Sequence, residues 1–142
     1  MKNWKKWVIG ISAIAVLASL SWAFNEFLAD SMESASDSEV IATLKGYAMA
    51  EESYFREYQE FALNEEKIGF SAESKHMKVF FTKKALPAKY LDVLEVDSLP
   101  YVAKDSYRIL LAAERQDKNR IEFWTVSNSH GPRKLKQHVP VE

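Results

Sequence analysis

The chain has 142 residues, of which 47% are hydrophobic and 13% aromatic, and it contains no cysteine. This composition favours one folded domain over a disordered chain. Without cysteine the chain has no disulfide, zinc-thiolate site or thiol nucleophile. The net charge is −1, and beyond Ala23 there are 16 basic against 20 acidic side chains. That balance argues against nucleic-acid binding, which needs clustered Lys and Arg.

The first predicted element is the uncharged run "WVIGISAIAVLASLSWAF" at residues 7–24. As a helix it would be roughly 27 Å long, close to the thickness of a hydrocarbon core. Basic residues precede it and acidic residues follow it, which predicts a cytoplasmic amino terminus and an exported remainder. We therefore expect residues 1–28 to be a basic start and a single-pass anchor in a bacterial cytoplasmic membrane, with the domain in the periplasm. The anchor residues are Trp7, Val8, Ile9, Ile11, Ile14, Val16, Leu17, Leu20, Trp22 and Phe24.

The same run has a second interpretation as a signal peptide at residues 1–23. Ser21, Trp22 and Ala23 match a small-x-small cleavage site after a basic start and an Ala-rich apolar stretch. Cleavage after Ala23 would release a soluble periplasmic or secreted protein. Both interpretations export the domain.

Residues 29–39, "ADSMESASDSE", are small, polar and acidic, so they form either a linker or a continuation of the preceding helix. A fresh helix start at Ser36 is the other option, because Ser36 and Glu39 have capping-box spacing. The exported domain is expected at residues 40–142, and it opens with an amphipathic helix at residues 40–63. Its apolar stripe comprises Val40, Ile41, Leu44, Tyr47, Ala48, Phe55, Tyr58 and Ala62.

The second half of the chain predicts strands. Residues 77–81 and 90–96 are short and β-rich, and "SYRILLAAE" and "RIEFWTVS" flank the turn sequence "RQDKN" as a hairpin. Residues 130–142 are expected to form a loose tail. The predicted fold class is α+β, with a hydrophobic amino-terminal helix and an amphipathic helix packed on a three- to four-stranded antiparallel sheet. One face of this sheet is expected to pack inward and the other to be mixed.

Glu51 is the most interesting carboxylate because it falls on the apolar stripe between Ala48 and Phe55. A half-buried carboxylate can have a raised pKa and act as an acid or base. It can equally pair with a strand Lys or Arg, or accept backbone N–H groups. Together with Tyr54 and Phe61, which lie off the centre of the stripe, Glu51 is a candidate contact surface.

No motif predicts catalysis or cofactor binding. His76, His130 and His138 lack metal-ligand spacing, and the chain has neither a glycine-rich phosphate loop nor a Gly-x-Ser-x-Gly elbow. We therefore expect no metal, no cofactor and no enzymatic activity.

The stretch "TLKGYAMAEESYFREYQEFA" at residues 43–62 resembles the first-helix region of type IV pilin-like proteins and of the pseudopilins of type II secretion. The matching residues are Leu44, Ala50, Glu51, Tyr54, Phe55 and Phe61, and the late hairpin carries a similar aromatic-Thr pair at Trp124 and Thr125. The chain departs from the pattern at Gly10, because "ISAIA" follows it where prepilins have the peptidase motif and its glutamate. The resemblance implies a pilin-like fold and a role in assembly, and the departure counts against prepilin-peptidase processing.

These observations lead to two expectations for function. The first is a non-enzymatic, membrane-anchored envelope protein that contacts membrane lipid and other envelope or pilin-like subunits. The alternative is a soluble small-ligand-binding module, released after Ala23, with its ligand between Tyr54 or Phe61 and the sheet.

Overall fold

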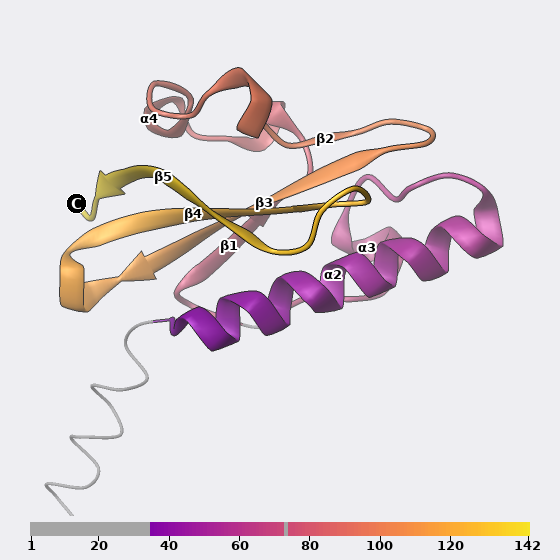
Figure 1. Ribbon diagram of the computed structural model, residues 1–142, viewed down its shortest axis with the longest axis horizontal. Helices are drawn as coiled ribbons and strands as arrows, with labels where there is room; N and C mark the ends of the chain where they lie inside the picture. The colour runs from indigo at the N-terminus through magenta and orange to yellow at the C-terminus, as the bar shows by residue number, and fades with distance from the viewer. Residues whose placement is uncertain (1–34, 73) are drawn as a thin grey trace, which may run out of the picture. The chain divides into compact units, whose positions relative to one another are not determined.

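The structure, a computed structural model, describes residues 35–72 and 74–142 (Figure 1). The expected anchor and signal-peptide residues therefore lie outside the described part of the chain. Among the residues that are described, no helix is both long enough and apolar enough to cross a membrane.

Helix α2 (Asp37–Tyr58) opens the described fold with a complete capping box. The Glu39 N–H donates to the Ser36 hydroxyl at 3.2 Å, and the Ser36 N–H donates to the Glu39 carboxylate at 2.9 Å. These bonds satisfy two N–H groups that a helix start leaves free. The helix ends five residues before the expected Leu63, because Gln59 adopts a left-handed conformation with φ 58° and closes it.

The sheet has five antiparallel strands, one or two more than expected, and α2 packs against it, which confirms an α+β fold. The strand order is β1-β3-β4-β5, and the short β2 also pairs with β3. The strands are β1 (Met77–Phe80), β2 (Tyr101–Val102), β3 (Tyr107–Arg115), β4 (Arg120–Ser127) and β5 (Arg133–Pro140).

The β3–β4 hairpin forms where the sequence predicts it. Its turn contains the 3-10 helix η3 (Gln116–Lys118) and then Asn119, whose φ of 47° is tolerated by a short polar side chain. The register pairs Arg115 with Arg120 at the turn end and Arg108 with Ser127 at the far end.

Two sequence-based expectations about the second half are wrong. Residues 90–96 do not form a strand, because Pro87 starts the helical turn α4 (Ala88–Leu91) and the 3-10 helix η2 (Val96–Ser98) follows. Within this segment Tyr90 and Leu94, four residues apart, are both buried against the sheet.

The expected loose tail is also wrong, since it contains strand β5. β5 pairs with the outer edge of β4 and buries Val139, while most of its other side chains are exposed. Lys134 and Lys136 therefore lie on an edge strand, where charge discourages pairing with another sheet.

Each face of the sheet has its own hydrophobic core. Helix α2 covers the face that carries Ile109, Leu111 and Trp124. Residues 81–99, which include the 3-10 helix η1 (Lys83–Ala85), supply the cover for the opposite face, which carries Leu110 and Phe123 (Figure 1). The opposite face is mixed in composition, as expected, because it also carries Arg108 and Glu114, and its apolar residues are buried under the segment between β1 and β2.

The short helix α3 (Glu65–Ile68) follows α2 and connects it to β1. Tyr47 links the two helices, because its hydroxyl donates to the Glu65 carboxylate and accepts from the Ala72 N–H at 3.1 Å. Tyr47 is fully buried, so the aromatic stripe of α2 is core at this position.

Candidate functional site

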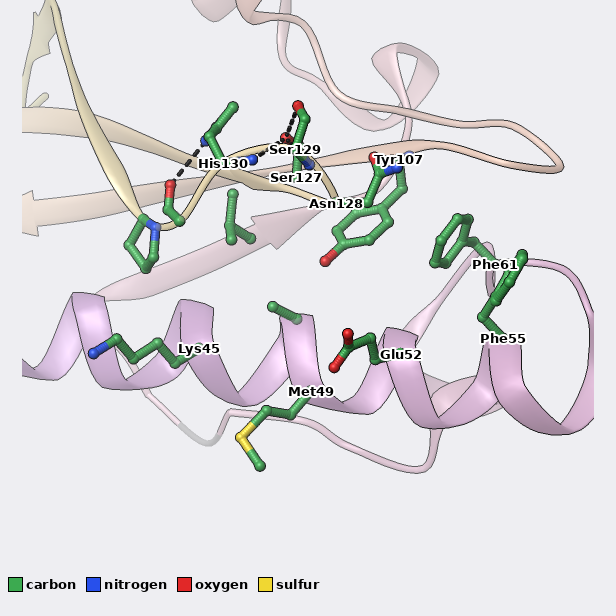
Figure 2. Close-up of a pocket in the computed structure, with 14 residues that line it drawn as sticks. Lys45, Met49, Glu52, Phe55, Phe61, Tyr107, Ser127, Asn128, Ser129 and His130 are labelled. Carbon is green, nitrogen blue, oxygen red and sulfur yellow. Dashed lines mark hydrogen bonds between the residues drawn. The ribbon is translucent and has the colours of Figure 1, made fainter.

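A groove of about 710 Å³ separates the middle of α2 from the loop between β4 and β5, and we take it as the candidate site (Figure 2). Its apolar floor and side walls come from Ala48, Phe55, Phe61, Tyr107 and Val126. Its polar rim is formed by Lys45 and Glu52 of α2 and by residues 127–131 of the loop. The volume is in the range of small-ligand sites, roughly 300–1,000 Å³.

The loop wall of the groove is held in place by its own hydrogen bonds. The Ser127 hydroxyl accepts from the N–H groups of Ser129 at 3.1 Å and His130 at 3.2 Å. The Asn128 side chain accepts from the Tyr107 N–H at 3.2 Å and donates to the Asp105 carbonyl at 3.3 Å. The loop is thus tied to β3, so the groove is largely pre-formed.

Tyr107 presents a hydroxyl to the groove from an otherwise buried side chain. The residue is 2% exposed, and Figure 2 shows its hydroxyl directed toward the space between the loop and α2. Within the described residues this hydroxyl has no hydrogen-bond partner. Burial, and then the charges of Glu51 and Glu52, raise the pKa of Tyr107 to about 12, so it is a neutral donor and acceptor at neutral pH.

Three ionisable side chains lie on the rim of the groove: Lys45 and Glu52 of α2 and His130 of the loop. Lys45 on α2 and His130 on the loop form no ion pair within the described residues. The Nδ1–H of His130 donates to the Gly131 carbonyl at 2.8 Å, because a carbonyl can only accept, and this leaves Nε2 available. Glu52 is 69% exposed and its carboxylate lies 3.9 Å from Arg56, a pair that solvent screens strongly.

Glu51 precedes the groove residue Glu52 on α2 and is completely buried. One carboxylate oxygen accepts from the Ala62 N–H at 2.8 Å, and the other has no hydrogen-bond partner within the described residues. Burial raises the pKa of Glu51 to about 7, although the bond from Ala62 acts in the opposite direction. Of the partners that the sequence left open for Glu51, the structure shows a backbone N–H, and no strand Lys or Arg pairs with it among the described residues.

The structure separates the three residues of the predicted contact surface. Glu51 has no exposed surface, so it cannot itself touch a partner. Phe61 is half-buried and its ring lies 4.6 Å from Phe55 and 4.8 Å from Tyr107, which places it at one end of the groove. Tyr54 is not among the groove residues, and its ring packs 4.4 Å from that of the exposed Tyr58.

A second cluster of charges, which sequence reasoning missed, surrounds the buried Glu122 on the α2 face. Its carboxylate accepts from Arg115 at 3.0 Å, Arg120 at 2.6 Å and Lys134 at 2.9 Å. Burial alone would raise the pKa of Glu122, but the hydrogen bonds from these three cations outweigh burial and lower it to about 2. The cluster is fully paired, so it is a structural feature and not an open site.

The described residues contain no group of three or more His, Asp or Glu side chains arranged to hold a metal ion. His76 has a buried Nδ1 without a hydrogen-bond partner in this part of the chain, whereas His138 is exposed. His76 directly precedes β1, His130 lies in the β4–β5 loop and His138 lies on β5.

A comparison of the chain with protein-family models, with curated proteins and with solved structures found no match. The site must therefore be interpreted from its own geometry.

Sequence reasoning found Phe61 and Glu51 because both belong to the helical pattern of residues 43–62. It missed the loop at residues 127–132 and the Tyr107 hydroxyl. The strand order places these beside α2, and that pairing is a long-range property of the sheet. The one available signal was the cluster of Ser, Asn and Gly after the second strand of the hairpin, which marks a loop.

Proposed function

We propose that the chain is a single-pass protein of a bacterial envelope, with residues 35–142 serving as a contact domain for partner subunits. The uncharged run at residues 7–24 supports anchoring, because lipid is the favourable surroundings for such a stretch. The basic start and acidic continuation support export of the domain. The pilin-like motif at residues 43–62 and the helix-then-antiparallel-sheet order support a role in assembly like that of a minor pilin or pseudopilin.

The observation that carries the contact role is the groove beside α2, at which Met49 is 69% exposed. Beside Met49 lies the groove, whose floor is apolar and whose rim is polar. Apolar surface with a polar rim is typical of sites where proteins associate.

Sequencing the amino terminus of the native protein tests the anchor. An intact Met1 is expected, because the anchor would stay attached to the domain. A start at Phe24 would show release by signal-peptide cleavage and would contradict the anchor. A start at Ile11 would show processing after Gly10, as in a pilin.

Crosslinking in the native membrane tests the contact role. A lysine-reactive crosslinker is expected to capture the chain in complexes larger than a monomer, since the rim of the groove carries Lys45. Recovery of the monomer alone, at crosslinker concentrations that capture a known membrane complex in the same cells, would overturn the role.

The volume of the groove favours a second candidate function, a small-ligand-binding module. Its aromatic floor, the free Tyr107 hydroxyl and the Lys45 ammonium suit a ligand with an apolar body and an anionic group. This candidate requires the start at Phe24 together with saturable binding that Phe61→Ala weakens. A start at Met1 without such binding would exclude it.

A further inference from the structure

Three aromatic rings gather at one end of the groove, and we call Phe55, Phe61 and Tyr107 the aromatic wall. The Phe61 ring stacks on Phe55 with centroids 4.6 Å apart and tilts against Tyr107 at 4.8 Å. All three residues line the groove, and Figure 2 shows Phe55 and Phe61 at the end away from Lys45. Aromatic rings attract a further ring in stacked or edge-to-face contact. The wall therefore favours an aromatic ligand over an aliphatic one.

The Tyr107 hydroxyl gives the aromatic wall a polar point. The side chain is 2% exposed, and its hydroxyl is directed into the groove with no hydrogen-bond partner among the described residues (Figure 2). A ligand that covers this hydroxyl without bonding to it leaves a buried polar group unpaired, which costs binding free energy. A matching polar group on the ring avoids that cost, so this hydroxyl discriminates between rings.

The charges near the Tyr107 hydroxyl decide which polar group suits it. Burial raises the pKa of Tyr107, and the carboxylates of Glu51 and Glu52 raise it further. Negative charge at this position favours the positive end of a ligand dipole, which is an N–H or O–H donor, over a carbonyl or carboxylate. Glu52 also lines the groove, and Figure 2 shows its carboxylate directed toward the same space as the hydroxyl.

The remaining charges on α2 do not favour an ion at the aromatic wall. Lys45 lies about two helical turns before Glu52, roughly 10 Å along the axis of α2. Arg56 is 3.9 Å from Glu52, but it is exposed and does not line the groove. Lys45 and Glu52 together give the α2 side of the rim no net charge, so an uncharged ring suits this end of the groove.

We propose that the aromatic wall binds a free small molecule with an uncharged aromatic ring, whose N–H or O–H group donates to the Tyr107 hydroxyl. This inference rests on the second candidate function, because it names the class of ligand for that site. The hydrogen bonds of Ser127 and Asn128 hold the opposite wall in place before a ligand enters. A pre-formed site loses little conformational entropy on binding.

Fluorine NMR with 5-fluoroindole and its N-methyl derivative tests the proposal, because the two probes differ in the N–H donor. The full-length chain, purified with its native amino terminus, is placed in lipid nanodiscs, and empty nanodiscs measure partitioning into lipid. Saturable binding of 5-fluoroindole is expected, with several-fold weaker binding of the N-methyl derivative. Equal affinities, or no saturation up to about 1 mM, would overturn the proposal.

Tyr107→Phe removes the hydroxyl and keeps the ring. It should weaken the binding of 5-fluoroindole roughly 2- to 10-fold and leave the affinity for the N-methyl derivative unchanged. Tyr90→Phe is the matched control, since Tyr90 is also buried, at 4% exposed, but packs on the opposite face of the sheet. The control should bind both probes as the natural chain does. Equal weakening of both probes by Tyr107→Phe would show a packing effect and would overturn the proposal.

Lysine crosslinking in the native membrane separates this inference from the contact role. If 5-fluoroindole does not bind while crosslinking captures larger complexes, the inference fails and the contact role stands. If 5-fluoroindole binds as expected and only the monomer is captured, the inference stands and the contact role fails. If 5-fluoroindole disperses the captured complexes at the concentrations at which it binds, a side chain of a partner subunit occupies the aromatic wall. That result would overturn the assignment to a free small molecule.

Discussion

Arg115 binds the buried carboxylate of Glu122 through Nε at 3.0 Å and, through its other nitrogens, the Ala35 carbonyl and the Asp37 carboxylate. One guanidinium therefore joins the end of strand β3 to the start of helix α2. Ala35 is the first described residue and Asp37 is the first residue of α2, so the beginning of the described chain is fixed to the sheet.

Arg115→Met should destabilise the domain by about 3 kcal/mol, because removing one partner of a buried pair leaves charge poorly compensated. Urea denaturation of the purified full-length chain measures this loss. Lys118→Met is the control, since its ammonium lies 3.6 Å from the Glu122 carboxylate and its side chain is 43% exposed. The control should cost less than about 1 kcal/mol. Equal losses for the two variants would show that the link to α2 is unimportant.

The stability of the fold should fall as the pH rises toward 7 and above, because of Glu51. Its pKa is raised from 4.5 to about 7 in the folded state, so the folded state holds a proton that the unfolded state releases. The stabilisation is complete below pH 4.5 and is lost as the pH rises through about 7, by at most about 3 kcal/mol. Glu51→Gln keeps an acceptor for the Ala62 N–H and should abolish this dependence.

Unfolding free energies of the two proteins at pH 5 and pH 8 measure the effect of Glu51. Relative to the natural chain, Glu51→Gln should have a higher unfolding free energy at pH 8 than at pH 5. Glu57→Gln is a suitable control because Glu57 is exposed on the same helix. A parallel pH dependence in the natural chain and Glu51→Gln would show that another group is responsible.

Acid should destabilise the fold through Glu122, whose pKa is shifted in the opposite direction to that of Glu51. Its pKa is lowered from 4.5 to about 2, so its contribution is present above pH 4.5 and is lost as the pH falls through about 2. Glu122→Gln should be less stable than the natural chain at pH 6. The difference in unfolding free energy between the two proteins should decrease toward pH 2. Tryptophan fluorescence during acid titration reports this, because Trp124 lies two residues away on the same strand. A difference in unfolding free energy that stays constant with pH would contradict the ion-pair explanation.

Gly46→Ala should destabilise the domain although alanine favours helices. A Cβ at Gly46 would lie 2.6 Å from the Phe70 ring, which itself packs edge-on against Tyr47 with centroids 4.8 Å apart. The expected net loss is about 1–2 kcal/mol, since overpacking costs about 1–3 kcal/mol and helix propensity returns up to about 1 kcal/mol.

Thermal or urea unfolding measures this loss, and a double-mutant cycle identifies its cause. Phe70→Leu alone should be destabilising, but Gly46→Ala should cost less in the Phe70→Leu background than in the natural chain. Strictly additive effects would mean that the Phe70 ring moves freely and that Gly46 has another role.

The local features of this protein follow from residues that are close together in the chain. The capping box at Ser36, the apolar stripe of α2, the β3–β4 hairpin and the burial of Glu51 are all set by residues within one or two turns or one strand pair. Periodicity reports such features because neighbouring residues share an environment.

Other features depend on how separate segments pack together, and local patterns do not predict them. Residues 90–96 are apolar enough for a strand; Pro87 favours a helical start, and the packing of Tyr90 against Phe123 holds the resulting turn on the sheet. The carboxy-terminal residues form strand β5 because they pair with the free edge of β4. The groove, the link from Arg115 to Ala35 and the two separately covered faces arise in the same way. Each joins segments far apart in the chain, and their meeting depends on the order of the strands, which no local pattern encodes.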